Sequence, residues 1–194
     1  MKTFRIAVCL ALFAAVAGIA AANSPAIGAA APAFQLTTID GKPFSLADAT
    51  RTNKAVVVMF IATKCPYSNA YNVRLKSMAD EYAKKGILFV GVNSNKTEPE
   101  NEVKAHAKEN GWGFTVVKDP DNKVADLYDA KRTPEVFVVD ASGKVQYHGR
   151  IDENYEDATK VTSPDLKNAL DALLGGQPVS KAETRAFGCT IKRA

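Results

Sequence analysis

Runs of apolar residues separated by polar segments indicate an alternating series of strands and helices. Residues 55–62 and 87–92 are apolar throughout, which is typical of strands buried on both faces of a sheet. Between these runs, apolar residues recur at helical spacing, at Tyr71, Leu75, Met78, Ala79 and Tyr82. The order strand, helix, strand predicts a right-handed βαβ unit with parallel strands.

Shorter segments continue the alternation on both sides of this unit. Residues 32–46 predict two short strands joined by an Asp-Gly turn. Beyond residue 92 the pattern predicts, in chain order, a helix opened by a capping box at Thr97 and Glu100 and stopped by Gly111, a strand at 114–117, a short helix at 124–128, a hairpin at 135–149 and a helix at 163–176. The chain therefore reads as one α/β domain without internal repeats.

The first 22 residues have the pattern of a targeting segment. Lys2 and Arg5 precede the uncharged apolar run 6–19, and three alanines then provide the small residues of a cleavage site. The run is short for a bilayer-spanning helix, which needs about 20 residues. We expect a signal peptide at 1–22, a domain at 23–176 and a polar tail at 177–194, in a protein that is periplasmic or secreted and has no membrane span after cleavage.

Composition narrows the class of partner. The 194 residues are 46% hydrophobic and 24% charged, as in ordinary globular proteins, and the formal net charge is +4. The basic residues are scattered, so the sequence predicts no nucleic-acid partner. His106 and His148 stand without carboxylate or cysteine at ligand spacing, so we expect no metal site, and nothing in the sequence calls for a cofactor.

Candidate chemistry lies where the first buried strand meets the helix that follows it. After loss of the leader with Cys9, the chain keeps Cys65 and Cys189, in a compartment that permits disulfides. Cys65 stands at the predicted helix start, where unpaired N–H groups stabilise a thiolate. Pro66 suits the first helical turn, and Lys64 places a cation in the sequence beside the cysteine. We expect Cys65 to be reactive rather than an inert core thiol.

These residues carry a family resemblance. The order of elements, with Cys-Pro-Tyr-Ser at 65–68 and Thr133-Pro134 before a strand, resembles the thioredoxin superfamily. Within it, segments 65–67, 149–155 and 188–192 resemble the peroxiredoxin-like redoxins of the alkyl hydroperoxide reductase/thiol-specific antioxidant group. The resemblance implies a thioredoxin fold, a central mixed sheet flanked by helices, with an N-terminal β-hairpin extension.

The resemblance also implies roles for residues around the cysteine. Thr133 and Pro134 would form a cis-proline loop that binds substrate backbone, with Pro66, Tyr67 and Ser68 beside it. Arg132 would lie near Cys65 and, with Lys64, favour its thiolate; a solvated surface position is the alternative for Arg132. Arg150 is a second candidate cation, and its alternative is an ion pair with Asp152 or Glu153.

Two departures from the family patterns matter. Ser68 stands where thioredoxins have the second cysteine of Cys-x-x-Cys, so a mixed disulfide on Cys65 cannot be resolved within the motif. Val58 and Ala62 stand where true peroxiredoxins have the proline and the threonine that precede the peroxide-reducing cysteine. Cys189 could resolve an intermediate on Cys65, form a static bond to the body, or pair with a second chain.

The leading hypothesis is an exported thiol-dependent oxidoreductase of the peroxiredoxin-like kind. In it, the Cys65 thiolate attacks a peroxide or a disulfide, and Cys189 or an external thiol resolves the intermediate. A thiol electron donor such as a thioredoxin-like protein would restore the reduced form. The alternatives are a monothiol disulfide-exchange protein and a redox-inactive binding module in which Cys65 and Cys189 form a structural bond.

Overall fold

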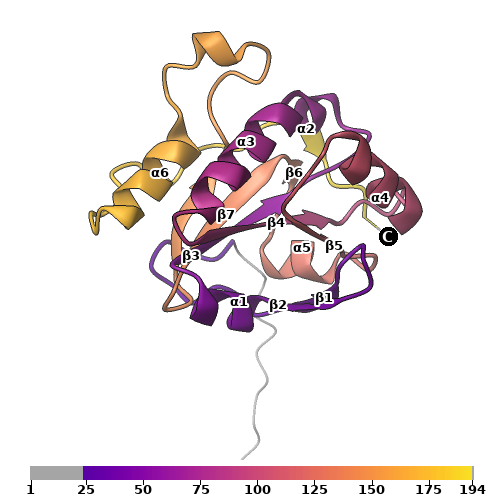
Figure 1. The fold of residues 1–194 in the computed structure, drawn as a ribbon, viewed down its shortest axis with the longest axis horizontal. Coiled ribbons are helices and arrows are strands. Elements are labelled where there is room, and N and C mark those ends of the chain that lie inside the picture. The colour runs from indigo at the N-terminus through magenta and orange to yellow at the C-terminus, as the bar shows by residue number, and fades with distance from the viewer. Residues whose placement is uncertain (1–23, 194) are drawn as a thin grey trace, which may run out of the picture.

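A five-stranded mixed sheet forms the centre of the molecule (Figure 1). The computed structural model describes residues 24–193, and the strand order is β5-β4-β3-β7-β8. The strands are β3 (Ala55–Phe60), β4 (Ile87–Asn93), β5 (Thr115–Lys118), β7 (Glu135–Asp140) and β8 (Val145–Gly149). Strands β3, β4 and β5 are parallel, and β7 is antiparallel to both β3 and β8. The fold is a thioredoxin fold, so the predicted class and the predicted βαβ unit are confirmed.

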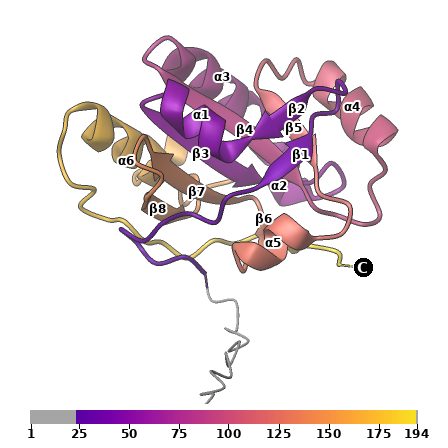
Figure 2. The same cartoon turned by 90° about the horizontal axis from the view of Figure 1, so that it is seen from below.

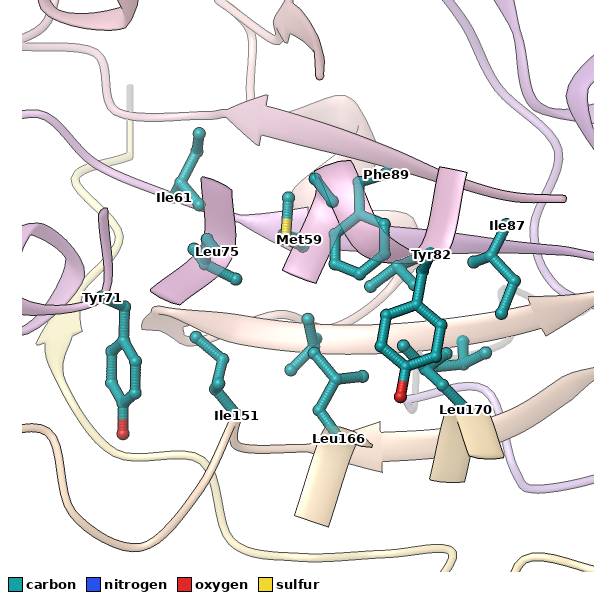
Figure 3. Packing of buried hydrophobic residues seen from close by; sticks show 14 of the residues in the cluster. Met59, Ile61, Tyr71, Leu75, Tyr82, Ile87, Phe89, Ile151, Leu166 and Leu170 are labelled. Atoms are coloured by element: carbon teal, nitrogen blue, oxygen red, sulfur yellow. The ribbon is translucent and has the colours of Figure 1, made fainter. Parts of the chain in front are cut away.

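Helices cover both faces of this sheet. One face carries α3 (Asn72–Ala83), α4 (Glu100–Glu109) and α6 (Asp165–Leu174), and the other carries α1 (Leu46–Thr52) and α5 (Lys123–Leu127). Successive side chains of a strand point to opposite faces, so Val57 and Met59 join the first core while Val56 and Val58 join the second. Figure 3 shows the first core, in which Met59 and Leu75 lie between β3 and α3. The apolar runs of the sequence are therefore strands buried on both faces.

The N-terminal hairpin was predicted, but the helix after it was not. Strands β1 (Gln35–Thr37) and β2 (Pro43–Ser45) pair antiparallel around the Asp-Gly turn. The hydroxyl of Ser45 then caps α1 by accepting the Asp48 N–H at 3.3 Å. This helix has seven residues, of which Leu46 and Ala49 are its buried apolar ones, too few for a periodic signal.

The predicted capping box before α4 is wrong. Pro99 is the N-cap residue of α4, and no side chain caps the helix. The neighbouring acid, Glu98, turns into the protein instead of lying on the helix surface, with an exposed fraction of 1%. The Thr-x-x-Glu spacing is thus present without the geometry of a capping box. Glu98 instead makes the buried contacts that are described below.

The helix after Cys65 is divided in two. A short α2 (Pro66–Ala70) is followed by α3, and Tyr71 lies at the junction with φ −93° and ψ −4°. Tyr71 is fully buried, and its hydroxyl donates to Asp152 Oδ1 at 2.7 Å. The Arg74 guanidinium binds the same carboxylate at 2.7 Å. The 149–155 segment that carries the family resemblance thus fixes the helix that follows the cysteine.

The predicted tail lies against the body of the protein. Figure 2 shows it in yellow, passing from α6 beneath β8 and β6 towards α5. Its two-residue strand β9 (Cys189–Thr190) pairs antiparallel with β6 (Arg132–Thr133), and a 3-10 turn (Ala158–Lys160) precedes α6. The predicted signal peptide lies outside the described residues. Within residues 24–193, no helix has the length and apolar character needed to cross a membrane.

Candidate active site

Cys65 caps the helix that it begins. Its backbone is extended, with φ −95° and ψ 117°, and Pro66 occupies the first turn of α2. The Ser68 N–H donates to Cys65 Sγ at 3.4 Å, within the range of a hydrogen bond to sulfur. The Cys65 side chain is 3% exposed. The sulfur therefore lies at the positive end of a helix but beneath other groups.

A buried carboxylate holds the loop that leads into Cys65. Glu98 Oε2 accepts the Thr63 N–H at 2.9 Å, and Oε1 accepts the Lys64 N–H at 2.9 Å. The side-chain amides of Asn93 and Asn95 donate to the same two oxygens, at 2.6 and 3.1 Å. Burial disfavours the charged form of Glu98, but these four hydrogen bonds outweigh it and lower the pKa of Glu98.

Sequence reasoning missed this role of Glu98. In the chain, the residue lies between Thr97 and Pro99 and has the pattern of a helix start. Nothing local shows that its side chain reaches a loop more than 30 residues earlier. The contact depends on how β4 lies beside β3, which only the folded sheet provides.

The predicted cis-proline loop lies directly over the cysteine. The Thr133–Pro134 peptide bond is cis, and Cys65 Sγ lies 3.1 Å from the Thr133 carbonyl oxygen, which accepts from the sulfur only while Cys65 is protonated. Thr133 and Pro134 are buried. The Thr133 hydroxyl is buried too. It has no other hydrogen-bond partner among the described residues, so it is free to donate to the sulfur. Both the carbonyl and the side chain of Thr133 therefore lie next to Cys65.

The residue after the proline secures this loop from inside. Glu135 Oε2 accepts the N–H groups of Lys131 and Arg132, at 2.7 and 2.8 Å. Its other oxygen, Oε1, lies 2.8 Å from His148 Nε2, and the His148 ring stacks on Phe137. His148, which the sequence excluded as a metal ligand, thus belongs to the support of the loop. Residues 24–193 hold no group of three or more histidine, cysteine or acidic residues placed to bind a metal ion.

The tail brings the second cysteine to the same place. Cys189 pairs with Thr133 in the β6–β9 ladder, so the two cysteines approach from opposite ends of the chain. Their side chains lie within hydrogen-bonding reach of one another, and both are free thiols. The Tyr67 N–H, from the first turn of α2, points to the Cys189 sulfur. The structure therefore joins Cys65, Thr133 and Cys189 in one site.

The two thiols differ in acidity. Burial disfavours the Cys65 thiolate, but hydrogen bonds from the Cys189 and Thr133 side chains, with backbone N–H groups, outweigh burial and lower the pKa of Cys65. Burial, together with the hydrogen bond to the charged Cys65 and its repulsion, raises the pKa of Cys189 to about 11. Cys65 is therefore the more acidic thiol of the pair, and the first proton that the pair loses comes from Cys65.

The predicted cations lie elsewhere. Lys64 Nζ lies 2.7 Å from Glu102 Oε2 and donates to the Thr97 carbonyl at 3.0 Å, in an exposed pair. Arg132 donates to Thr190 Oγ1 at 3.0 Å and is exposed. Neither side chain is among the main causes that shift the pKa of Cys65. The thiolate is thus stabilised by hydrogen-bond donors, while Lys64 binds α4 and Arg132 binds the tail.

The remaining predicted residues, Ser68, Tyr67 and Arg150, differ in burial and in the groups that they contact. Ser68 is buried, and its hydroxyl accepts the Ala62 N–H at 3.1 Å, which ties α2 to the end of β3. Tyr67 is half-buried and contacts the rings of Tyr155 and Phe187. The Arg150 guanidinium pairs with Asp165 at 2.7 Å, so the predicted ion pair exists but with a different acid.

The fold and this site define a class, a thioredoxin-fold protein with a helix-capping cysteine beside a cis-proline loop. The model of the AhpC/TSA family matches residues 27–148, more than half of the chain, so the chain belongs to the AhpC/TSA family. The matched segment includes Cys65 and Pro134 but ends before the tail. Cys189 is therefore a feature of this chain beyond the matched region.

Several proteins are similar to this chain. The thiol-disulfide oxidoreductase ResA of Geobacillus thermodenitrificans is 29% identical over 121 residues, which are 62% of this chain and 67% of ResA. The thiol:disulfide interchange protein DsbE of Allochromatium vinosum is 27% identical over 158 residues, 80% of this chain and 81% of DsbE. A solved structure of an uncharacterized conserved protein from Geobacillus kaustophilus is 35% identical, with a TM-score of 0.82 over 89% of this chain and 94% of that one.

Proposed function

We propose that this chain is a thiol-disulfide oxidoreductase whose redox group is the Cys65–Cys189 pair. The observation that supports it is two thiols held within reach of each other, with the pKa of Cys65 lowered and that of Cys189 raised. The names of the relatives ResA and DsbE point to the same chemistry. The pair supplies from the tail the second thiol that the Cys-Pro-Tyr-Ser motif lacks.

The reaction proceeds by two thiol–disulfide exchanges. The Cys65 thiolate attacks one sulfur of a substrate disulfide, and the other substrate sulfur leaves as a thiolate. Cys189 then loses its proton and attacks the Cys65 sulfur, which releases the second substrate thiol and leaves a Cys65–Cys189 bond. Two electrons pass from the dithiol to the substrate, and an external thiol donor, such as a thioredoxin-like protein, restores the dithiol. With the predicted leader, this chemistry takes place outside the cytoplasm.

Peroxide is the second candidate oxidant, supported by membership of the AhpC/TSA family and by the lowered pKa of Cys65. The Cys65 thiolate would attack the O–O bond and become a sulfenic acid, and condensation with Cys189 would release water. The site has fewer groups that would assist peroxide reduction than disulfide exchange. Val58 and Ala62 stand where true peroxiredoxins have proline and threonine, and the main causes that lower the pKa of Cys65 are hydrogen bonds rather than a cation.

The test compares oxidation of the reduced protein by glutathione disulfide and by hydrogen peroxide, followed by rapid quench and mass spectrometry. We expect glutathione disulfide to give a Cys65–Cys189 bond, and Cys189→Ser to stop at a glutathione adduct on Cys65. Cys65→Ser should form neither product. Peroxide oxidation of Cys65 much faster than that of free glutathione would instead favour the peroxidase.

Two results would contradict the proposal. A stable adduct on Cys65 with Cys189 present would indicate a monothiol exchange protein. A Cys65–Cys189 bond that no dithiol reduces, with neither oxidant reacting at Cys65, would indicate a structural bond in a binding module.

A further inference from the structure

The tail forms backbone pairs with the edge of the cis-proline loop. The register pairs Thr190 with Arg132 and Cys189 with Thr133, and the Ile191 N–H donates to the Lys131 carbonyl at 3.1 Å. This edge belongs to no other strand among the described residues. The tail therefore lies across the reactive sulfur in the way that an extended peptide adds to a free strand edge.

Glycine is required at the position before Cys189. Gly188 has φ +141°, and a Cβ atom built on it would lie 2.1 Å from the Thr133 carbonyl oxygen. That oxygen belongs to the backbone of the cis-proline loop, which Glu135 holds in place, so it cannot move aside. Any residue with a side chain would have to leave the edge. The backbone of the edge therefore excludes residues other than glycine at the position before the cysteine.

Side chains on both sides of the Gly-Cys pair are also bound. Phe187 lies against the rings of Tyr67 and Tyr155, with centroids 6.3 and 6.1 Å away. Ile191 is 3% exposed and packs into the second core. The edge therefore has an aromatic contact two residues before the cysteine and an aliphatic pocket two residues after it.

Residues 187–191 add little to the body of the protein. Of residues 177–193, Ile191 is the one buried member of the two core clusters, and the partly buried Val179 packs against the first. The tail adds no strand to the five-stranded sheet, and its one bridge to that sheet, between Glu183 and His148 of β8, lies before residue 187. Leaving the edge therefore costs the contacts of a short segment and not those of the fold, as expected of a region that opens locally.

We propose that residues 187–191 are an internal ligand that occupies the cis-proline edge in place of substrate, and that the edge selects extended segments with glycine before the reactive cysteine and an aliphatic residue two positions after it. The partner class is a protein disulfide in such a segment. The inference rests on the proposed function and deepens it. The tail and the partner peptide compete for the same edge.

The test uses the full chain carrying Cys189→Ser, so that Cys65 is the reactive thiol. The probe is the peptide Phe-Gly-Cys-Thr-Ile-Lys with thionitrobenzoate in disulfide linkage to its cysteine. Attack by the Cys65 thiolate forms a peptide–Cys65 disulfide and releases thionitrobenzoate, which is measured by absorbance, while mass spectrometry identifies the adduct. We expect this peptide to react about tenfold faster, or more, than the peptide with alanine in place of glycine, a factor that corresponds to about 1.4 kcal/mol.

A second substitution tests the competition. Gly188→Ala, added to Cys189→Ser, should displace the tail and accelerate the reaction of the glycine peptide severalfold. Gly176→Ala is the matched control, because Gly176 also has positive φ (+67°) but no atom within 4 Å of its Cβ position. The control should leave the rate unchanged.

The outcomes separate the two proposals. Equal rates for the glycine and alanine peptides, with Cys65 reactive, would overturn the peptide site and leave the proposed function standing. A Cys65 that attacks neither peptide, nor glutathione carrying the same thionitrobenzoate group, would overturn both. Acceleration by Gly176→Ala as large as that by Gly188→Ala would show that the effect does not arise at the edge.

Discussion

The two cysteines of the site are held by regions of very different construction. Cys65 follows β3, in which all six residues are buried, and its loop is fixed by the four hydrogen bonds of Glu98. Cys189 lies half-buried on a two-residue strand, next to the exposed Thr190. The proposed nucleophile is thus part of the core, whereas its partner thiol is attached through edge contacts that can open locally.

The difference in support matches a difference in charge. At the rigid side, the Cys189 and Thr133 side chains and the N–H of Ser68 lower the pKa of Cys65, and at the edge side the raised pKa keeps Cys189 protonated. In the proposed reaction, attack therefore starts from the fixed sulfur, and the sulfur that must move is the one that resolves. This arrangement suits a substrate peptide that takes the place of the tail.

Loss of Glu98 should have the largest effect, because it removes the support of the rigid side. Glu98→Ala leaves two buried N–H groups, on Thr63 and Lys64, without their acceptor. We expect the free energy of unfolding to fall by about 3 kcal/mol. Urea denaturation at neutral pH measures it.

A neighbouring acid provides the control for that change. Glu102 forms an exposed pair with Lys64, so Glu102→Ala should change stability by less than about 1 kcal/mol. The pH dependence gives a second check. The pKa of Glu98 is lowered in the folded state, so its contribution is present above the unfolded value of about 4.3 and is lost as pH falls through the folded value. A difference between wild type and Glu98→Ala that grows in acid would contradict this role.

Loss of Ile191 should affect the edge side and leave the rigid side intact. Ile191→Ala removes the one tail side chain, among residues 177–193, that is buried in the clusters of the core. We expect the favourable free energy of tail docking to decrease by about 2 kcal/mol. This decrease lowers the equilibrium constant for formation of the Cys65–Cys189 bond about thirtyfold. Equilibration with glutathione buffers measures it.

The control for Ile191→Ala is Val73→Ala, since Val73 is 77% exposed on α3. It should leave the glutathione equilibrium unchanged. A loss of global stability in Ile191→Ala as large as that in Glu98→Ala, without a change in the disulfide equilibrium, would place the tail in the rigid core and remove the distinction between the two regions.

Substitution of Thr133 should give a smaller effect, at the point where the two regions meet. Thr133→Val removes a hydroxyl that stabilises the Cys65 thiolate, so the pKa of Cys65 should rise. The pH midpoint of Cys65 alkylation by iodoacetamide, measured in the Cys189→Ser background, should move to higher pH. Thr63→Val is the matched control, because the Thr63 hydroxyl is buried and lies two positions before Cys65 in the chain but is not among the main causes of the lowered pKa of Cys65. An equal shift in both variants would contradict a specific role for Thr133.

The parts of the site that the sequence predicted are those with a local signal. A helix start with Cys65 and Pro66, and a Thr-Pro before an apolar strand, can be read within a few residues. The apolar runs at 55–62 and 87–92 predicted the sheet because strands buried on both faces have no polar alternation.

The parts that were missed depend on contacts distant in the chain. The tail is polar in sequence, and its strand exists because Gly188 fits against the Thr133 carbonyl. Glu98 reaches the Cys65 loop only across two neighbouring strands. The cation expected from Lys64 illustrates the converse, since adjacency in the chain did not bring its ammonium to the sulfur.

Lys64→Met should therefore have the smallest effect of these changes. The ammonium is bound to Glu102 and to the Thr97 carbonyl, at an exposed position, and is not among the main causes of the lowered pKa of Cys65. We expect the alkylation midpoint of Cys65 to stay within error of wild type, while Thr133→Val moves it. If Lys64→Met raised that midpoint as much as Thr133→Val does, a mobile cation and not fixed hydrogen-bond donors would stabilise the thiolate. The low pKa of Cys65 would then be caused by a surface residue. The difference in pKa between the two cysteines would no longer follow from the different way in which the two regions are held.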